Sequence, residues 1–161
     1  MTIQKGDTLP SVTLKKLGAD GMQDINIADY VAGKKVILFA VPGAFTPTCA
    51  QKHLPGYIAK ADDIKSKGVD EIICIAVNDP FVMKHWGEVA GADGKVTMMP
   101  DGNGAFTKAI GMEFDGSGAG LSFRSKRYVM VINKGVIEDV QVEAAPGALE
   151  LSGAEVCLTR L

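Results

Sequence analysis

The stretch KVILFAVPGAFTPTCA, residues 35–50, joins a buried strand to the beginning of a helix. Lys35 to Val41 is an almost continuous apolar run that ends at Pro42-Gly43, which is typical of a central strand buried on both faces. Apolar residues between positions 50 and 64 recur at three- and four-residue spacing, as in an amphipathic helix. A second strand-like run covers residues 71–77. Strand, helix and strand in this order predict a βαβ unit with two parallel strands.

The rest of the chain predicts further elements around this unit. They are a helix from Asn78-Asp79-Pro80 to Gly91, a strand over 95–99, a short helix over 103–110 capped by Asn103, a flexible Gly-rich connection over 116–120, an antiparallel hairpin of 127–132 with 136–142, and a last helix opened by a capping box from Ser152 to Glu155. This order predicts an α/β fold of the thioredoxin-like type, with a central mixed β-sheet flanked by helices. We expect one domain over residues 1–161.

Composition excludes several classes of protein. With 47% hydrophobic and 22% charged residues, the chain is that of an ordinary globular protein. A net charge of −2 gives no reason to expect nucleic acid as a partner, and no window is apolar enough to span a membrane. We therefore expect a cytoplasmic protein.

The three cysteines, at positions 49, 74 and 157, include no Cys-x-x-Cys pair. They suit neither a disulfide scaffold nor a zinc site, and His53 and His85 add no ligand spacing. We therefore expect no metal and no cofactor. An odd number of cysteines in a reducing compartment leaves at least one free thiol.

Cys49 occupies a position that favours chemistry. Thr46 followed by Pro47 predicts an N-cap and the first helical residue, which places Cys49 at the third helical position with its sulfur facing free backbone amides. Helix N-termini lower the pKa of a cysteine, and the resulting thiolate is nucleophilic and oxidisable. The alternative is a small apolar core residue. Because polar residues such as Lys52 flank it at a strand-to-helix junction, we expect Cys49 not to be buried in the core.

The motif Pro42-x-x-x-Thr46-x-x-Cys49 resembles the Pro-x-x-x-Thr-x-x-Cys signature of peroxiredoxins. The longer string PGAFTPTCAQKHLPGY is similar to the peroxiredoxin-5 or type II subfamily, in its bacterial and plant forms. The resemblance extends to GVDEIICIAVNDPFVMKHW at residues 68–86, to DGNGAF at 101–106 and to SKRYVMVINKG at 125–135. It therefore covers most of the chain.

The resemblance implies a role for each matching residue. Cys49 is expected to be the peroxidatic nucleophile that attacks a hydroperoxide and becomes a sulfenic acid. Thr46 is expected to hold the sulfur and the peroxide through its hydroxyl, and Pro42 to shield the pocket from water. Arg127 matches the active-site arginine, which favours the thiolate and binds the peroxide oxygens. Without the resemblance, the plainer interpretation of Arg127 is a solvated arginine at the end of a strand. Arg124, three residues earlier, is the alternative match.

Recycling of the sulfenic acid could follow either of two routes. Cys74 matches a cysteine that is sometimes called resolving in type II relatives, but it lies within a strand, where a buried core cysteine is the stronger interpretation. A disulfide with Cys49 requires local unfolding, because bridged Cα atoms approach within about 7 Å. We therefore expect reduction by an external thiol, for which the resemblance to type II peroxiredoxins implies glutathione with glutaredoxin, and thioredoxin through a Cys49–Cys74 disulfide is the alternative. We interpret Cys157 as a residue that packs in the core and takes no part in catalysis.

The predicted function is a thiol-specific peroxidase that reduces hydrogen peroxide and small alkyl hydroperoxides. A disulfide reductase or isomerase is disfavoured because its chemistry relies on Cys-x-x-Cys. A peroxide sensor or redox relay stays open. The resemblance also implies a homodimer formed by loops around the site, for which Phe45, Pro47 and Trp86 are candidate contact residues, although core packing accounts for them equally well.

Overall fold

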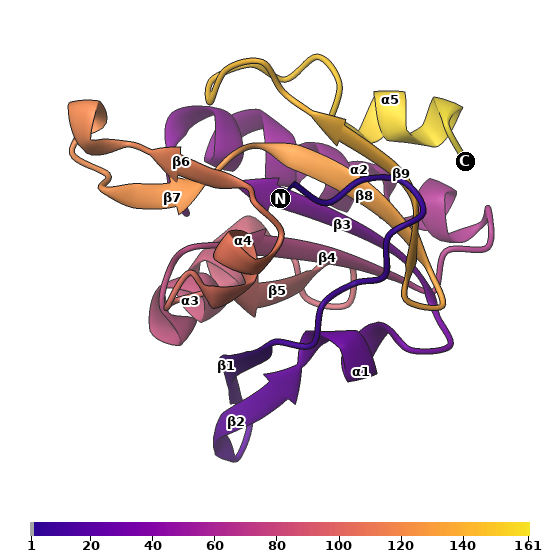
Figure 1. Cartoon of the computed structure of the whole chain (residues 1–161), viewed down its shortest axis with the longest axis horizontal. Helices are drawn as coiled ribbons and strands as arrows, with labels where there is room; N and C mark the ends of the chain where they lie inside the picture. The colour runs from indigo at the N-terminus through magenta and orange to yellow at the C-terminus, as the bar shows by residue number, and fades with distance from the viewer. Residues whose placement is uncertain (1) are drawn as a thin grey trace.

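The computed structural model describes residues 2–161 and is built around a five-stranded mixed sheet (Figure 1). Its strands lie in the order β5 (Thr97–Pro100), β4 (Glu71–Ala76), β3 (Lys35–Val41), β8 (Tyr128–Asn133) and β9 (Val136–Val142). β3 pairs with β4 and β4 with β5 in parallel, whereas β8 is antiparallel to both β3 and β9. The predicted α/β class, the central mixed sheet and the hairpin are confirmed.

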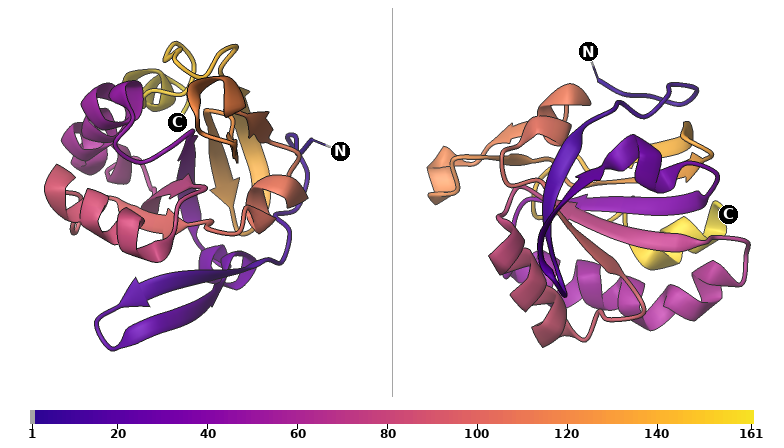
Figure 2. Two further views of the ribbon diagram at one scale, coloured as in Figure 1. Left: turned by 90° about the vertical axis from the view of Figure 1, so that its left-hand side faces the viewer. Right: turned by 90° about the horizontal axis from the view of Figure 1, so that it is seen from below.

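Helices cover both faces of the sheet (Figure 2). On one face, α2 (Leu54–Lys65), α3 (Pro80–Ala90) and α5 (Ala154–Thr159) bury Tyr57, Trp86 and Cys157 against alternate residues of the strands. The other face carries α1 (Ile27–Val31) and α4 (Ala105–Ala109). Because the central strands are buried on both faces, the sequence of β3 is a continuous apolar run.

Two hairpins outside the central sheet are absent from the sequence prediction. β1 (Thr13–Gly18) pairs with β2 (Gly21–Asn26), and β6 (Glu113–Asp115) pairs with β7 (Phe123–Ser125). They project from the body of the molecule (Figure 1), so most of their side chains meet solvent and no apolar alternation marks them. The Gly-rich segment predicted to be a flexible connection forms a short 3-10 helix, η2 (Ser117–Ala119), at the tip of the second hairpin.

The helix that follows β3 begins at Pro47, as predicted, and then widens. The turn η1 (Cys49–His53) is a π-helix, in which the Leu54 N–H donates to the Cys49 carbonyl before α2 continues. Pro55 explains the wider turn, because a proline has no N–H for the carbonyl four residues earlier and its ring clashes with that carbonyl. The widened turn places Cys49 and His53, which are both buried, on the side of the helix that faces the sheet.

Two predicted helix caps are wrong. Ser152 does not cap α5, because its hydroxyl donates to the Glu143 carboxylate and the N-cap is Gly153. Asn103 does not cap α4. Instead the buried Asp101 carboxylate accepts from the backbone N–H groups of Phe106 and Thr107. The N-terminus of α4 is therefore held by a buried side chain from outside the predicted capping pattern, whereas no side chain caps α5.

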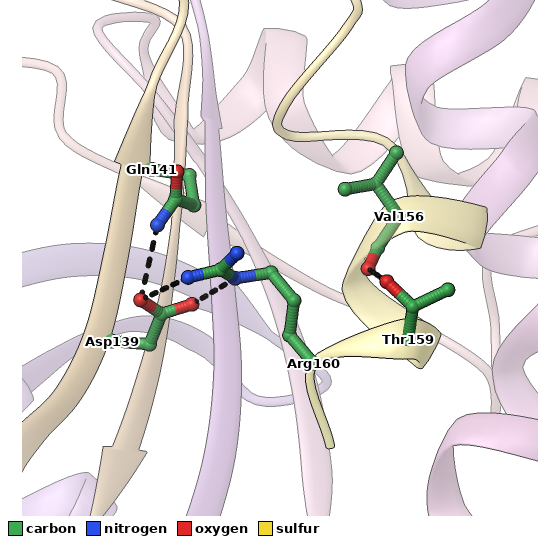
Figure 3. Close-up of polar contacts among 5 residues, drawn as sticks. All are labelled: Asp139, Gln141, Val156, Thr159 and Arg160. Carbon is green, nitrogen blue, oxygen red and sulfur yellow. Dashed lines mark hydrogen bonds and ion pairs between the residues drawn. The ribbon is translucent and has the colours of Figure 1, made fainter.

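The C-terminal helix is tied to the edge of the sheet by an ion pair (Figure 3). Arg160 donates from Nε and Nη2 to the two carboxylate oxygens of Asp139 in β9, at 2.5 and 2.9 Å. Gln141 donates to the same carboxylate, and within α5 the Thr159 hydroxyl donates to the Val156 carbonyl. The Arg160 pair lowers the pKa of Asp139, so this tie persists in mild acid. No helix within residues 2–161 is both long and apolar enough to cross a membrane.

Candidate active site

The Cys49 sulfur lies against a buried arginine. Arg127 immediately precedes β8, is 2% exposed, and donates from Nη2 to Cys49 Sγ at 3.0 Å. Cys49 is itself 0% exposed, so the expectation that it avoids the core is wrong. Burial is possible because the guanidinium supplies the polar partner that a thiolate needs away from water.

His53 holds the arginine on its other side. Arg127 Nη1 lies 2.7 Å from His53 Nδ1, and His53 Nε2 lies 3.0 Å from the Ser152 carbonyl. An arginine only donates, so Nδ1 accepts and the proton of the neutral ring is on Nε2. Burial, together with the adjacent Arg127 charge, lowers the pKa of His53 to about 3. The imidazole is therefore neutral at physiological pH and orients the guanidinium.

His53 lies outside the signature motif, and it was considered from the sequence only as a metal ligand, for which its spacing was unsuitable. One signal was available, since His53 lies four residues after Cys49 and so shares its helix face. Phe39 of β3 packs against the imidazole with ring centroids 4.7 Å apart and stacks on Tyr57 at 4.0 Å. The ring of His53 is thus fixed by an aromatic contact as well as by its two hydrogen bonds.

The loop that joins β3 to the helix is held by short polar contacts. The Thr46 hydroxyl donates to the Gly43 carbonyl at 2.7 Å, and the Thr46 carbonyl accepts from the Ala50 N–H as the first helical bond. Phe45 adopts a left-handed backbone conformation with φ of 63°, which makes the chain reverse before the helix. Within residues 2–161 no hydrogen bond joins Thr46 to the Cys49 sulfur, contrary to the role expected for its hydroxyl. The hydroxyl oxygen keeps its lone pairs for another donor.

Pro42 and Arg124 lie at the same loop. Pro42 is buried, as a shielding role requires, and its carbonyl accepts from Arg124 Nη1 at 3.4 Å. Arg124 also donates to the Leu121 carbonyl and lies so close to Gly43 that an added Cβ would be 2.6 Å from Nη1. Arg124 therefore packs over the loop, whereas Arg127 is the arginine that contacts the sulfur.

Cys74 lies in β4, between Phe39 of β3 and Met98 of β5, and is fully buried. It belongs to the same apolar cluster as Cys49. Burial raises the pKa of the Cys74 thiol well above its usual value, the neighbouring Cys49 sulfur adds to the effect, and Arg127 opposes it. Cys157 is buried in α5 beside the Tyr57 hydroxyl, and burial raises the pKa of its thiol too. All three cysteines are free thiols.

The other residues considered near the site divide into two groups. Phe45 is 48% exposed and Pro47 is exposed, whereas Trp86 is buried, with its ring centroid 6.2 Å from that of Phe45. Trp86 is thus a core residue, and the homodimer expected through this region stays a prediction. Within residues 2–161, no three His, Cys, Asp or Glu side chains gather into a group that could hold a metal ion.

The depressed pKa of His53 predicts how stability depends on pH. An unfolded histidine titrates near 6.5 and the folded one near 3, so between these values only the unfolded state takes up the proton. The stabilising contribution is complete above pH 6.5 and is lost as pH falls toward 3, with a slope of up to about 1.4 kcal/mol per pH unit. Urea unfolding from pH 7 to pH 4, followed by the fluorescence of the single Trp86, measures it.

In this experiment His53→Gln is expected to show a shallower loss of unfolding free energy than the wild type. His85→Gln is the matched control, because the His85 side chain is 69% exposed. Parallel curves for the wild type and His53→Gln would contradict the assignment of a buried, neutral His53.

Comparison with known proteins agrees with this geometry. The redoxin family model matches residues 4–158. Peroxiredoxin-2C of Arabidopsis thaliana is 44% identical over 160 residues, which cover 99% of this chain and 98% of that protein. The chain belongs to the peroxiredoxin family. A chloroplastic peroxiredoxin, 2E-2 of Oryza sativa subsp. japonica, is 47% identical over 99% of the chain and 73% of its own length.

Among solved structures, reduced Prx3 from Vibrio vulnificus in complex with hydrogen peroxide superposes with a TM-score of 0.94, at 50% identity and 99% coverage of both chains. As a peroxiredoxin, the chain is a thiol peroxidase, an oxidoreductase that acts on peroxides, with the thioredoxin-like fold. The contact between Arg127 and Cys49 is the feature of this chain that fits such chemistry.

Proposed function

We propose that Cys49 is the peroxidatic nucleophile of a peroxidase that reduces hydrogen peroxide and small alkyl hydroperoxides. The observation that carries the proposal is the 3.0 Å contact between Arg127 Nη2 and the Cys49 sulfur in a buried site. The thiolate attacks the terminal peroxide oxygen, the O–O bond breaks, and water or an alcohol leaves after taking up a proton. Cys49 is oxidised to a sulfenic acid and the peroxide is reduced.

Arg127 has the capacity to assist this step. Of its five N–H groups, three donate to Pro146 O, His53 Nδ1 and Cys49 Sγ, which leaves two for the peroxide. As the O–O bond breaks, negative charge moves onto the leaving oxygen, where a fixed guanidinium stabilises it. Thr46 contributes the free lone pairs of its hydroxyl as acceptors for a peroxide proton, and the buried Pro42 limits access of water. Because Cys49 is closed to solvent, a peroxide enters when neighbouring side chains shift.

Glutathione with glutaredoxin is the proposed reductant. One thiol condenses with the sulfenic acid to give a mixed disulfide and water, and a second thiol releases Cys49 as the thiol. Cys74 is poorly suited to the first step, because it is held within the central strand β4 and its raised pKa keeps it protonated. The chain has no other cysteine besides Cys157, which is also buried.

Turnover with each reductant tests this choice. The wild type and Cys74→Ser are compared with glutathione plus glutaredoxin and with thioredoxin plus its reductase. We expect Cys74→Ser to keep wild-type turnover with glutaredoxin, because the external thiol attacks Cys49 directly. Cys157→Ser is the control for a serine placed in the core. Loss of thioredoxin-supported turnover in Cys74→Ser, with Cys49 still oxidisable, would support the Cys49–Cys74 disulfide route instead.

A further inference from the structure

A buried carboxylate lies behind the site and contacts none of the reacting groups. Glu143 follows β9, is 7% exposed, and accepts four hydrogen bonds from one short segment. Its Oε1 accepts from the Glu150 N–H at 3.0 Å. Its Oε2 accepts from the Leu151 N–H at 2.8 Å and from both the N–H and the hydroxyl of Ser152 at 2.6 Å. One side chain therefore fixes the end of the segment formed by residues 144–152.

That segment in turn contacts four residues at or beside the candidate site through three carbonyl oxygens. Pro146 O accepts from Arg127 Nε at 3.0 Å, and Ser152 O accepts from His53 Nε2 at 3.0 Å and from the Tyr57 hydroxyl at 2.6 Å. Gly147 O accepts from the Thr48 hydroxyl at 3.3 Å. Residues 144–152 contain neither a helix nor a strand of their own. The position of these carbonyls therefore depends on what holds the segment.

Glu143 is also joined to Arg127 through the backbone. The Glu143 N–H donates to the Arg127 carbonyl at 2.9 Å, which extends the pairing of β8 and β9 by one step. Burial alone would raise the pKa of Glu143, but the bonds from Ser152, Glu150 and Leu151 outweigh it and lower the pKa. The carboxylate is therefore ionised at neutral pH, the state that accepts four donors most strongly.

We propose that Glu143 is a positioning residue for the peroxidase reaction. Its carboxylate fixes residues 144–152, and the carbonyl groups of that segment hold Arg127 and His53 in the geometry that presents the guanidinium to the Cys49 sulfur. Glu143 acts only through these residues. The inference rests on the role proposed above for Arg127.

Replacement of Glu143 by alanine removes all four acceptors. We expect kcat/KM for hydrogen peroxide to fall by about 10-fold to 100-fold, because a small displacement of a catalytic group is costly. Glu143→Gln is expected to recover most of this loss, because its amide oxygen at the Oε2 position keeps three of the four donors. Glu155→Ala is the matched control, since Glu155 lies exposed on α5, and it should keep the wild-type rate.

A double-mutant cycle separates positioning of Arg127 from general loosening of the fold. In an Arg127→Gln background, Glu143→Ala should lower the rate by less than about 2-fold further, because the group it positions is already absent. The same 10-fold to 100-fold loss in both backgrounds would overturn the inference. If Glu143→Ala does not fold, the cycle is run with Glu143→Gln, for which a loss of about 3-fold that vanishes in the Arg127→Gln background is expected.

The cycle also separates this inference from the proposed function. If Arg127→Gln alone keeps the wild-type rate, the role proposed for Arg127 fails. If Arg127→Gln is impaired but Glu143→Ala has the wild-type rate, only the inference about Glu143 fails.

Discussion

Cys49→Ser is expected to abolish peroxide reduction, with a fall in kcat/KM of more than about 10⁴-fold, because the attacking atom itself is removed. A serine hydroxyl beside Arg127 is not ionised near neutral pH and does not form a stable oxidised intermediate. The fold should persist, since serine is close in size to cysteine and the guanidinium can donate to its oxygen. Steady-state peroxide consumption with an excess of thiol measures the effect.

The matched control for this variant is Cys157→Ser. Cys157 is also fully buried, and its neighbour, the Tyr57 hydroxyl, offers the new serine a hydrogen-bond partner. Its activity should stay close to that of the wild type. Retained turnover in Cys49→Ser would remove Cys49 from the reaction altogether.

Arg127→Gln is expected to lower kcat/KM for hydrogen peroxide by about 10²-fold to 10³-fold, the usual cost of removing a fixed donor to developing charge. The variant loses the positive charge beside the sulfur, the donor to Pro146 O and the pair with His53. Reduction of an alkyl hydroperoxide should fall by a similar factor, because the same leaving oxygen is stabilised. Single-turnover oxidation of the protein by peroxide isolates this step from the reductant.

Arg124→Gln is the control that distinguishes the two arginines. Arg124 is partly exposed and donates to the carbonyls of Leu121 and Pro42, without contact with the sulfur. Its replacement should change the rate by less than about 3-fold, as for a surface substitution. A larger loss in Arg124→Gln than in Arg127→Gln would reverse the assignment.

Local patterns predicted the sheet and its main helices well, because their signals are short in range. The apolar run over residues 35–41 gave the bounds of β3, and the Asp79-Pro80 start of α3 was marked by cap chemistry. The hairpins β1–β2 and β6–β7 were missed because few of their residues are buried, so that no periodicity distinguishes them from loops.

The candidate site was predicted in part. The motif and the resemblance pointed to Cys49 and Arg127, and the structure brings the two together. The motif did not indicate that Cys49 is buried, since burial of the sulfur depends on a guanidinium that lies 78 residues away in the chain. His53 and Glu143 were missed for the same reason. Their partners, Ser152 and the 150–152 backbone, are brought near only by folding.

The measurement that tests the central claim most directly is the location of the oxygen atom after one oxidation by peroxide, before any reductant is added. The reduced protein is treated with one equivalent of hydrogen peroxide in the presence of a reagent that traps sulfenic acids, and each cysteine peptide is examined by mass spectrometry. The account predicts the trapped sulfenic acid on Cys49, with Cys74 and Cys157 still reduced. A sulfenic acid on Cys74 or Cys157 while Cys49 stays reduced would contradict it.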